Sequence, residues 1–242
     1  MLSACNRHGD VLADEVVLED GPFHCPACLG QVILKKGHIK IPHFAHLPDA
    51  ECTSPNEGES EEHQLAKLEI YEALLRTPGV TEVRLERYLQ EVRPDVSFVL
   101  NGELVAVEIQ LSLLSRDQIE WRTKTYTRKN IAVLWTPSFS RDLFQARYAP
   151  KDWERYLHTM YFGKVYYWFE GIKLVPVKFE EYTLASGWYS GTRRSKRFVS
   201  PSRLPPVFIP DLAPVWRKPW HDLPRAKLWC EPWIKSSQNC ID

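Results

Sequence analysis

An Asn-Gly pair between two alternating apolar segments constrains the fold of this chain more than any other feature. The pair, Asn101-Gly102, lies in RPDVSFVLNGELVAVEIQLS, residues 93–112. Asn-Gly favours a two-residue hairpin turn because both central residues need a positive φ. Apolar residues alternate with others on both sides of the turn: Val92, Val96, Phe98 and Leu100 before it, and Val105, Val107, Ile109 and Leu111 after it. The sequence therefore predicts a β-hairpin.

The turn also fixes which residues face each other. A two-residue loop places Leu100 opposite Glu103, and the same register places Asp95 opposite Glu108. Directly opposed side chains have Cβ atoms about 4.5–5.5 Å apart, so two carboxylates there repel each other. A divalent cation with oxygen ligands would remove this repulsion.

The alternative is a pair of hydrated acids on a solvent-exposed face of the hairpin. Three features favour a metal site instead. The acids adjoin strongly apolar strands, Glu62 and His63 belong to a segment just before the sheet, and Gln110 has the same facing as Glu108. We therefore expect Asp95 and Glu108 to bind Mg²⁺ or Mn²⁺.

The segments around the hairpin predict an α-β-β-β-α-β order. Residues 59–76 form an amphipathic pattern that begins at Ser60, a candidate N-cap, and a short strand follows around Val83 and Leu85. After the hairpin, Ser115 begins a capping box and a helix to about Arg128. The apolar run at 131–135 predicts a buried strand.

A second candidate metal site precedes this core, in FHCPACLGQVILKKGHIKIPHFAH, residues 23–46. Cys25 and Cys28 form a C-x2-C pair, and His43 with His46 could complete a tetrahedral zinc site. The residues between the two pairs predict a hairpin with Val32 and Leu34 on its first strand, a turn at Lys36-Gly37, and Ile39 and Ile41 on its second. Zinc would stabilise a segment too small to bury a core of its own.

The ligand set of this zinc site stays open at one position. Other nearby residues could replace one imidazole, namely Cys52, Cys5, His24 and His38. The alternative is that the histidines lie on the surface and the thiols bind nothing.

Charge is balanced over the 242 residues but unevenly distributed. Residues 1–62 hold four Lys and Arg against eleven Asp and Glu, whereas residues 191–229 hold nine against two. The basic end predicts a polyanionic partner. Its Arg and Trp residues favour single-stranded nucleic acid, and the alternative is that the Trp residues pin an irregular tail onto the core. His158, among aromatic residues of a short predicted helix, is expected to pack in the core.

An ordered set of motifs resembles the competence protein CoiA family, whose core is of the PD-(D/E)XK nuclease type. The motifs are CPAC, HFAH, ESEEHQLAK, RPDV, VEIQLS and WRTKTY. The resemblance implies a restriction-endonuclease-like α/β fold and a Mg²⁺-dependent DNA nuclease acting in transformation and recombination. It also implies a zinc-binding N-terminal element. The catalytic residues would be Asp95, Glu108, Gln110, Glu62 and His63, with Asp95 and Glu108 as metal ligands.

Gln110 departs from this pattern, because many such nucleases have Lys there. Gln donates a hydrogen bond but carries no charge. Arg93, Lys67 or Lys124 could supply the charge. If none does, the chain would be a DNA-binding recombination accessory with an inactive site. A third possibility is a protein-interaction module with structural zinc.

The predicted domains are a zinc-knuckle element at 1–57, a nuclease-like core at 58–150 and an irregular basic extension at 151–242. The extension is expected to open with a helix and a hairpin that turns at Glu170-Gly171. We expect a cytoplasmic protein with DNA and recombination proteins as partners and no membrane association. The apolar segments are too short to span a bilayer, and the six cysteines are too sparse for a disulfide scaffold.

Overall fold

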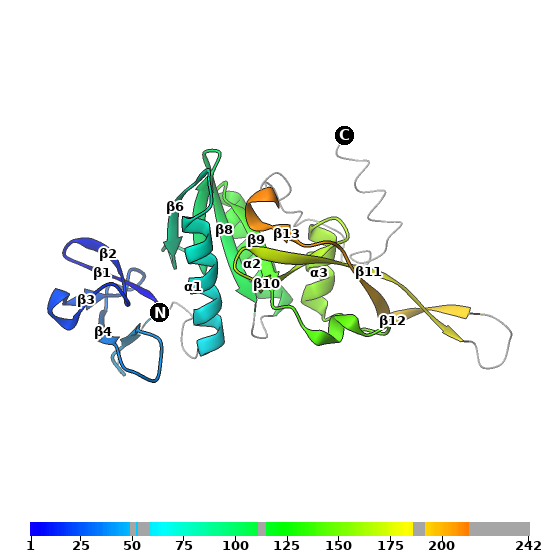
Figure 1. Cartoon of the computed structure of the whole chain (residues 1–242), viewed down its shortest axis with the longest axis horizontal. Helices are drawn as coiled ribbons and strands as arrows, with labels where there is room; N and C mark the ends of the chain where they lie inside the picture. Colours follow the sequence, from blue (N-terminus) through cyan, green and yellow to red (C-terminus); the bar gives the residue numbers. More distant parts are fainter. Residues whose placement is uncertain (49–51, 53–58, 111–114, 186–191, 213–242) are drawn as a thin grey trace. The chain divides into compact units, whose positions relative to one another are not determined.

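The computed structural model describes residues 1–48, 52, 59–110, 115–185 and 192–212 (Figure 1). The chain divides into two compact units, Met1–Val107 and Glu108–Asp242. This division falls inside a strand of the central sheet, and the domain boundaries expected from the sequence stay a prediction. Among the described residues, no helix is both long and apolar enough to cross a bilayer.

The first unit begins with a small antiparallel sheet of order β2-β1-β3-β4-β5. Its strands are β1 (Ser3–Asn6), β2 (Gly9–Leu12), β3 (Phe23–His24), β4 (Gln31–Lys35) and β5 (His43–His46), with a 3-10 turn, η1 (Leu18–Asp20), between β2 and β3. The predicted hairpin is present, and Val32 and Leu34 are buried as expected. Its second strand, however, is HFAH itself, and Ile39 is exposed in the loop.

The remainder of the first unit holds the predicted helix and the central hairpin. Helix α1 (Glu61–Leu75) begins at Ser60, whose hydroxyl accepts a hydrogen bond from the His63 N–H. The strands that follow are β6 (Val80–Leu85), β7 (Val96–Leu100) and β8 (Glu103–Gln110). Helix α1 packs against β6 and β7, and its Ile70 and Leu74 are buried.

The register predicted for the hairpin is confirmed. The pairs run from Leu100 with Glu103 to Val96 with Val107. Asn101 and Gly102 have φ values of +53° and +79°, as the two-residue turn requires.

The second unit continues with helix α2 (Arg116–Arg128), whose N-cap Ser115 forms the predicted capping box with Gln118. Strand β9 (Ala132–Pro137) is buried along its whole length. The Ser138 N–H donates to the Gln110 carbonyl at 3.3 Å, at the end of β8. The strand order β6-β7-β8-β9 and the element order α-β-β-β-α-β confirm the mixed α/β fold expected for the core.

The rest of the second unit is more regular than the sequence suggests. A second sheet has the order β10-β11-β12, with β13 paired to β11. The elements after β9 are η2 (Arg141–Phe144), α3 (Asp152–Met160), β10 (Val165–Glu170), β11 (Lys173–Ala185), β12 (Thr192–Arg203), β13 (Val207–Phe208) and η3 (Ile209–Leu212). The predicted hairpin is present, and its two turn residues are Gly171 and Ile172, one position after the predicted Glu170-Gly171.

The expectation of an irregular extension is therefore wrong for residues 192–212. Adjacent exposed basic residues, Arg193-Arg194 and Lys196-Arg197, interrupt the alternation that would predict a strand there. The outer part of the two-stranded ribbon buries neither face. The four Trp residues of the tail, from Trp216 to Trp233, lie outside the described residues. His158 is buried as expected: its Nε2 accepts the Phe179 N–H, and its ring stacks on the Phe179 ring.

Candidate functional site

Three cysteines and one histidine converge in the N-terminal sheet. The ligand atoms of Cys25, Cys28, His46 and Cys52 all lie within 4.8 Å of one another, and we call this group the thiol cluster. The Cys28 Sγ lies 3.4 Å from the His46 Nε2. The turn that carries Cys25 and Cys28 is closed by the Leu29 N–H, which donates to the Cys25 carbonyl at 2.9 Å.

The thiol cluster contains Cys52 where the first expectation was His43. His43 and His46 belong to the same strand, β5, and residues an odd number apart on a strand point to opposite faces. His46 shares the face of buried Phe44, whereas the His43 Nδ1 contacts the Ile41 carbonyl at 2.8 Å. His43 is therefore not part of the cluster, and Cys52 is the alternative residue that the structure brings in.

The donor set of the thiol cluster fits zinc. Zn²⁺ in structural sites is tetrahedral, and three thiolates with one imidazole are one of its common ligand sets. Burial raises the pKa of the Cys28 thiol, but hydrogen bonds from the Gly30 N–H and the neighbouring thiols outweigh burial and lower this pKa overall. A lowered pKa favours the thiolate, which is the form that binds metal.

A second cluster is centred on a buried lysine. His63 and Lys67 are four residues apart and lie on one face of α1, and Glu59, just before the N-cap Ser60, contacts both. Glu86 follows β6, and Asp95 precedes β7. We call these five residues the Lys67 cluster.

The contacts of Lys67 hold this cluster together. Its ammonium group lies 2.9 Å from a Glu86 oxygen and 3.1 Å from an Asp95 oxygen. It also contacts the Glu59 carboxylate. The Lys67 side chain is only 2% exposed. Burial disfavours its charge, but the carboxylates of Glu86, Asp95 and Glu59 outweigh burial and raise the pKa of Lys67. The lysine therefore carries its charge at any physiological pH.

Glu86 connects the Lys67 cluster to the N-terminal segment. Its carboxylate accepts hydrogen bonds from the backbone N–H groups of Leu2 and Ser3, at 3.0 and 3.3 Å. Arg93 lies 3.6 Å from the same carboxylate. Burial opposes ionisation, but Lys67 and Arg93 outweigh it and hold the pKa of Glu86 well below its usual range. Glu86 is thus a structural anion of the cluster.

His63 lies between two carboxylates. Its Nδ1 is 3.1 Å from Glu59, and its Nε2 is 3.2 Å from Asp95. Burial lowers the pKa of His63, but the hydrogen bond and charge of Asp95 outweigh burial, so this pKa is raised overall. A metal ion that takes His63 as a ligand must displace its proton.

Glu62, which was expected to be the acid from the helix, is exposed. A residue one position before His63 points about 100° away from it around the helix axis. Glu59, which precedes the N-cap Ser60, contacts the His63 Nδ1 instead. The structure therefore places Glu59, rather than Glu62, beside Asp95 and His63.

Glu108 belongs to the second unit, where its carboxylate is held by α2. The Arg122 Nη2 lies 2.5 Å from its Oε1, and the Tyr126 hydroxyl donates to the same oxygen. Burial and the charge of Glu108 raise the pKa of Tyr126 well above its usual value. Gln110 is buried, and Lys124 pairs with Glu120 at 2.9 Å. The charge partner of Glu108 is thus Arg122.

Glu59, His63 and Asp95 form a second group that could hold a metal ion, since their ligand atoms lie within 4.8 Å of one another. Two carboxylates suit Mg²⁺ or Mn²⁺, and the imidazole favours Mn²⁺ over Mg²⁺. Asp95 is 13% exposed, so solvent reaches this group. The donor set fits a divalent ion that shares its carboxylates with Lys67.

Comparison with known proteins identifies two domains of one family in the chain. "Competence protein CoiA, N-terminal domain" matches residues 13–55, and "Competence protein CoiA, nuclease-like domain" matches residues 59–149. Competence protein CoiA of Bacillus subtilis (strain 168) is 33% identical over 121 residues, which are 49% of this chain and 32% of that relative. The match thus spans about a third of the relative's length. No solved structure matches the chain.

Proposed function

Since the chain belongs to the CoiA-like family and carries its nuclease-like domain, we propose that it is a metal-dependent DNA nuclease with its reactive centre at Asp95. The observation that carries the proposal is the Lys67 cluster. It gathers a partly exposed aspartate, a second carboxylate and an imidazole at the start of the central hairpin. Paired carboxylates of this kind are the usual ligands of metal ions that act on phosphodiesters.

Three residues of this cluster would act as metal ligands. Asp95 and Glu59 would hold the metal ion, with His63 as a third ligand. When bound, the metal would lower the pKa of a coordinated water and offset the charge of the phosphate. The sequence also suggested Glu108 as a metal ligand, and this role stays a prediction.

Lys67 acts here as a positioning residue. Its side chain is 2% exposed and its ammonium group already contacts three carboxylates, so it lies too deep to meet a phosphate directly. It holds the Asp95 carboxylate in place, with 3.1 Å between the ammonium nitrogen and the Asp95 Oδ1. Many nucleases of this type have a lysine at the position of Gln110, where it can meet the phosphate. Lys67 therefore does not take over that role.

That conclusion gives weight to a second function, a DNA-binding recombination accessory that does not cut. Lys124 pairs with Glu120, and Arg93 lies against Glu86. Each basic residue considered as a substitute for the missing lysine thus has an acidic partner. A protein of this kind would bind DNA through charge alone, with zinc and the Lys67 cluster serving the fold.

One experiment separates these functions. Purified, zinc-loaded protein is incubated with labelled single- and double-stranded DNA in Mg²⁺, Mn²⁺ or EDTA. Cleavage that requires Mg²⁺ or Mn²⁺ supports the nuclease. Salt-sensitive binding without cleavage in either metal supports the accessory protein and contradicts the nuclease. The absence of both activities would leave the protein-interaction module with structural zinc.

A further inference from the structure

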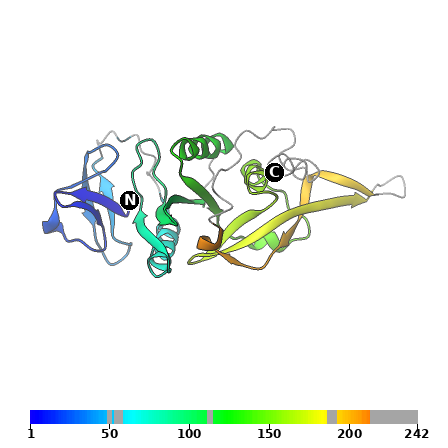
Figure 2. The same ribbon diagram turned by 90° about the horizontal axis from the view of Figure 1, so that it is seen from above.

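The second unit carries a long two-stranded ribbon made by β11 and β12. Its outer part pairs Thr183–Ala185 with Thr192–Arg194. In this part most side chains of both strands are exposed, and Figure 2 shows the ribbon extending from the rest of the unit. A ribbon that buries neither face contributes little to a core, and isolated two-stranded hairpins are marginally stable. Its conformation therefore has to be explained by something other than core packing.

The ribbon is strongly cationic. Residues 192–203 contain five basic residues and no acidic one; the five are Arg193, Arg194, Lys196, Arg197 and Arg203. Arg194 contacts Glu181 of the facing strand, at 3.7 Å and with both side chains largely exposed, so this pair is weak. Positive charge gathered without matching acids on the same strand attracts a polyanion.

A bulge directs part of this charge outward. Glu181 pairs with Val199 and Thr183 pairs with Arg194, so the four residues 195–198 lie opposite Tyr182 alone. The buried Ser195 hydroxyl accepts the N–H groups of Arg197 and Phe198, at 3.2 and 2.8 Å, and pins the bulge. Lys196 and Arg197 are exposed at its tip. Bulges commonly re-aim side chains at functional sites.

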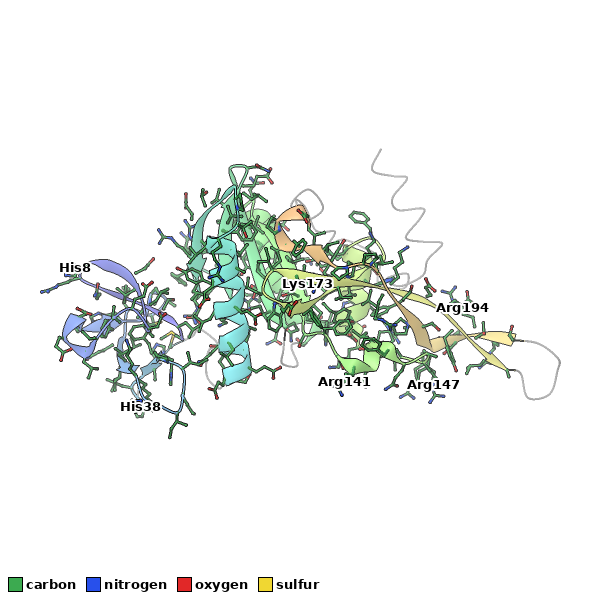
Figure 3. The ribbon with its side chains drawn as sticks, viewed as in Figure 1. His8, His38, Arg141, Arg147, Lys173 and Arg194 are labelled. Atoms are coloured by element: carbon green, nitrogen blue, oxygen red, sulfur yellow. The ribbon has the colours of Figure 1, made fainter. Side chains whose placement is uncertain are left out.

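Aromatic rings hold the neighbouring guanidinium groups in place. The Phe198 ring has two arginines beside it, with the Arg147 and Arg197 guanidinium carbons 4.6 and 5.3 Å from its centroid. Arg147 belongs to the segment whose next residue, Tyr148, bridges to Val199 on β12. Figure 3 labels Arg147 and Arg194 in this part of the second unit. Cation–π contacts restrict the arginine side chains before a ligand binds. Binding then costs less side-chain entropy.

These contacts bear on the form of the partner. A single strand would be held largely by bases stacked on aromatic rings. Here Phe198 already interacts with two guanidinium groups, and Arg203 lies over Phe144 at 4.2 Å. The rings thus position arginines, which contact phosphates. A two-stranded β-ribbon also fits the major groove of duplex DNA.

We propose that the β11–β12 ribbon and Arg147 bind the phosphate backbone of double-stranded DNA, with the outer ribbon lying in a groove. The choice of DNA among polyanions rests on the proposed function. The surface itself lies within the second unit and uses none of the residues assigned to the Lys67 cluster. Binding and cleavage can therefore be measured and can fail separately.

The test measures binding in EDTA, so that it does not depend on cleavage. The affinity of the full chain for a labelled 24-base-pair duplex, and for one strand of it, is determined by fluorescence anisotropy over a series of salt concentrations. The variants are Lys196→Ala/Arg197→Ala and its charge-reversed form Lys196→Glu/Arg197→Glu. The control, Lys40→Ala/Arg76→Ala, removes two exposed cations from the first unit. Thermal melting verifies that all variants fold.

We expect the alanine pair to weaken duplex binding about 10-fold and to flatten the slope of log affinity against log salt by about two, since each phosphate contact contributes about 0.9 to the slope. The charge-reversed pair should weaken binding further, and the control should bind like wild type. This pattern supports the ribbon even if the protein cuts no DNA.

Three results would overturn the inference. One is an unchanged salt slope in both ribbon variants. Another is wild-type binding that is tighter to the single strand than to the duplex, with the ribbon variants affecting only the single strand. The third uses vesicles of 30% phosphatidylserine in phosphatidylcholine: loss of vesicle binding in the variants with duplex binding intact would assign the ribbon to a membrane surface.

Discussion

The thiol cluster and the Lys67 cluster lie in the same unit, and each gathers several metal-binding groups, yet they differ in where their positive charge comes from. In the Lys67 cluster the cation is part of the chain: a buried ammonium group contacts three carboxylates. In the thiol cluster four ligand atoms converge on a common centre, as a metal ion from solution requires. The Lys67 cluster thus has a cation of its own, whereas the thiol cluster could hold a metal ion from solution.

Removing the metal from the thiol cluster should have the largest effect. Structural zinc contributes apparent free energies of about 10–16 kcal/mol in zinc-finger peptides, so its loss can unfold a small element. We expect one zinc per chain and loss of zinc and of amide protection in β1–β5 in Cys52→Ser, as in Cys25→Ser. Elemental analysis and hydrogen exchange measure the two effects.

His43→Ala is the matched control, because His43 lies on the opposite face of β5 from His46. It should keep its zinc. Zinc loss in His43→Ala with zinc retained in Cys52→Ser would show that the original ligand set was right and that the thiol cluster is not the site.

Substitution of Lys67 should come next. Lys67→Met leaves Glu86 and its neighbours as uncompensated buried charge, which typically costs about 3–5 kcal/mol. We expect a decrease of this size in the free energy of unfolding, measured in urea with zinc present. Lys124→Met, which removes a 43% exposed lysine from an i,i+4 pair, should change stability by about 0.5 kcal/mol or less. A loss below 1 kcal/mol in Lys67→Met would mean that the built-in cation does not hold this cluster together.

Neutralising Asp95 should have a smaller effect on stability and a clear effect on metal binding. Asp95→Asn keeps the shape of the side chain but removes the charge that faces Lys67 and His63, at a cost of about 1–2 kcal/mol. We expect the affinity for Mn²⁺ to decrease at least 10-fold. Titration calorimetry on zinc-loaded protein measures it. Equal Mn²⁺ affinity in wild type and Asp95→Asn would place the divalent site elsewhere.

The smallest expected effect is a difference in how the two clusters respond to mild acid. Protons compete with zinc for thiolates and imidazole, so zinc release should increase as the pH falls from 7 to 5. The lowered pKa of Glu86 means that its contribution is present above its unfolded value of 4.5 and is lost only as the pH falls below that. The raised pKa of Lys67 keeps its contribution constant at every pH below 10.5.

The pKa of His63 is raised from 6.5 and Lys67 lowers it, so the comparison is made in a His63→Ala background. The stability difference between His63→Ala and His63→Ala/Lys67→Met should stay constant from pH 7 to pH 5, while a zinc indicator records release. Urea unfolding of both proteins at three pH values in this range measures it. A difference that shrinks in step with zinc release would show that the Lys67 cluster depends on the metal too.

Turn and capping residues predicted the fold well where the geometry of a turn or a helix start depends on neighbouring residues alone. Asn101-Gly102 determined the hairpin register, and Ser115 with Gln118 determined the start of α2. The interpretation of HFAH as the end of a hairpin paired His43 with His46, whereas the structure groups His46 with three cysteines. When HFAH is read as a strand, its alternation separates His43 from His46.

The Lys67 cluster was only partly accessible from sequence. The spacing of His63 and Lys67 by four residues is a helical signal. Glu59 precedes the N-cap of α1, so helical spacing does not predict its contact with His63. Glu86 gave no such signal. It reaches Lys67 through the path of the chain after β6, with a φ of +49° that few non-glycine residues adopt, and only tertiary structure shows this.

The most direct test of the account is the single-turnover cleavage rate of duplex DNA by zinc-loaded wild type, Asp95→Asn and the exposed control Asp14→Asn, in Mn²⁺ and at saturating protein. The account predicts that wild type and Asp14→Asn cut at the same rate and that EDTA stops both. Asp95→Asn should cut at least 100-fold more slowly while it binds the duplex and retains zinc as wild type does. Cleavage by Asp95→Asn at the wild-type rate would contradict the claim that the reactive centre lies at Asp95.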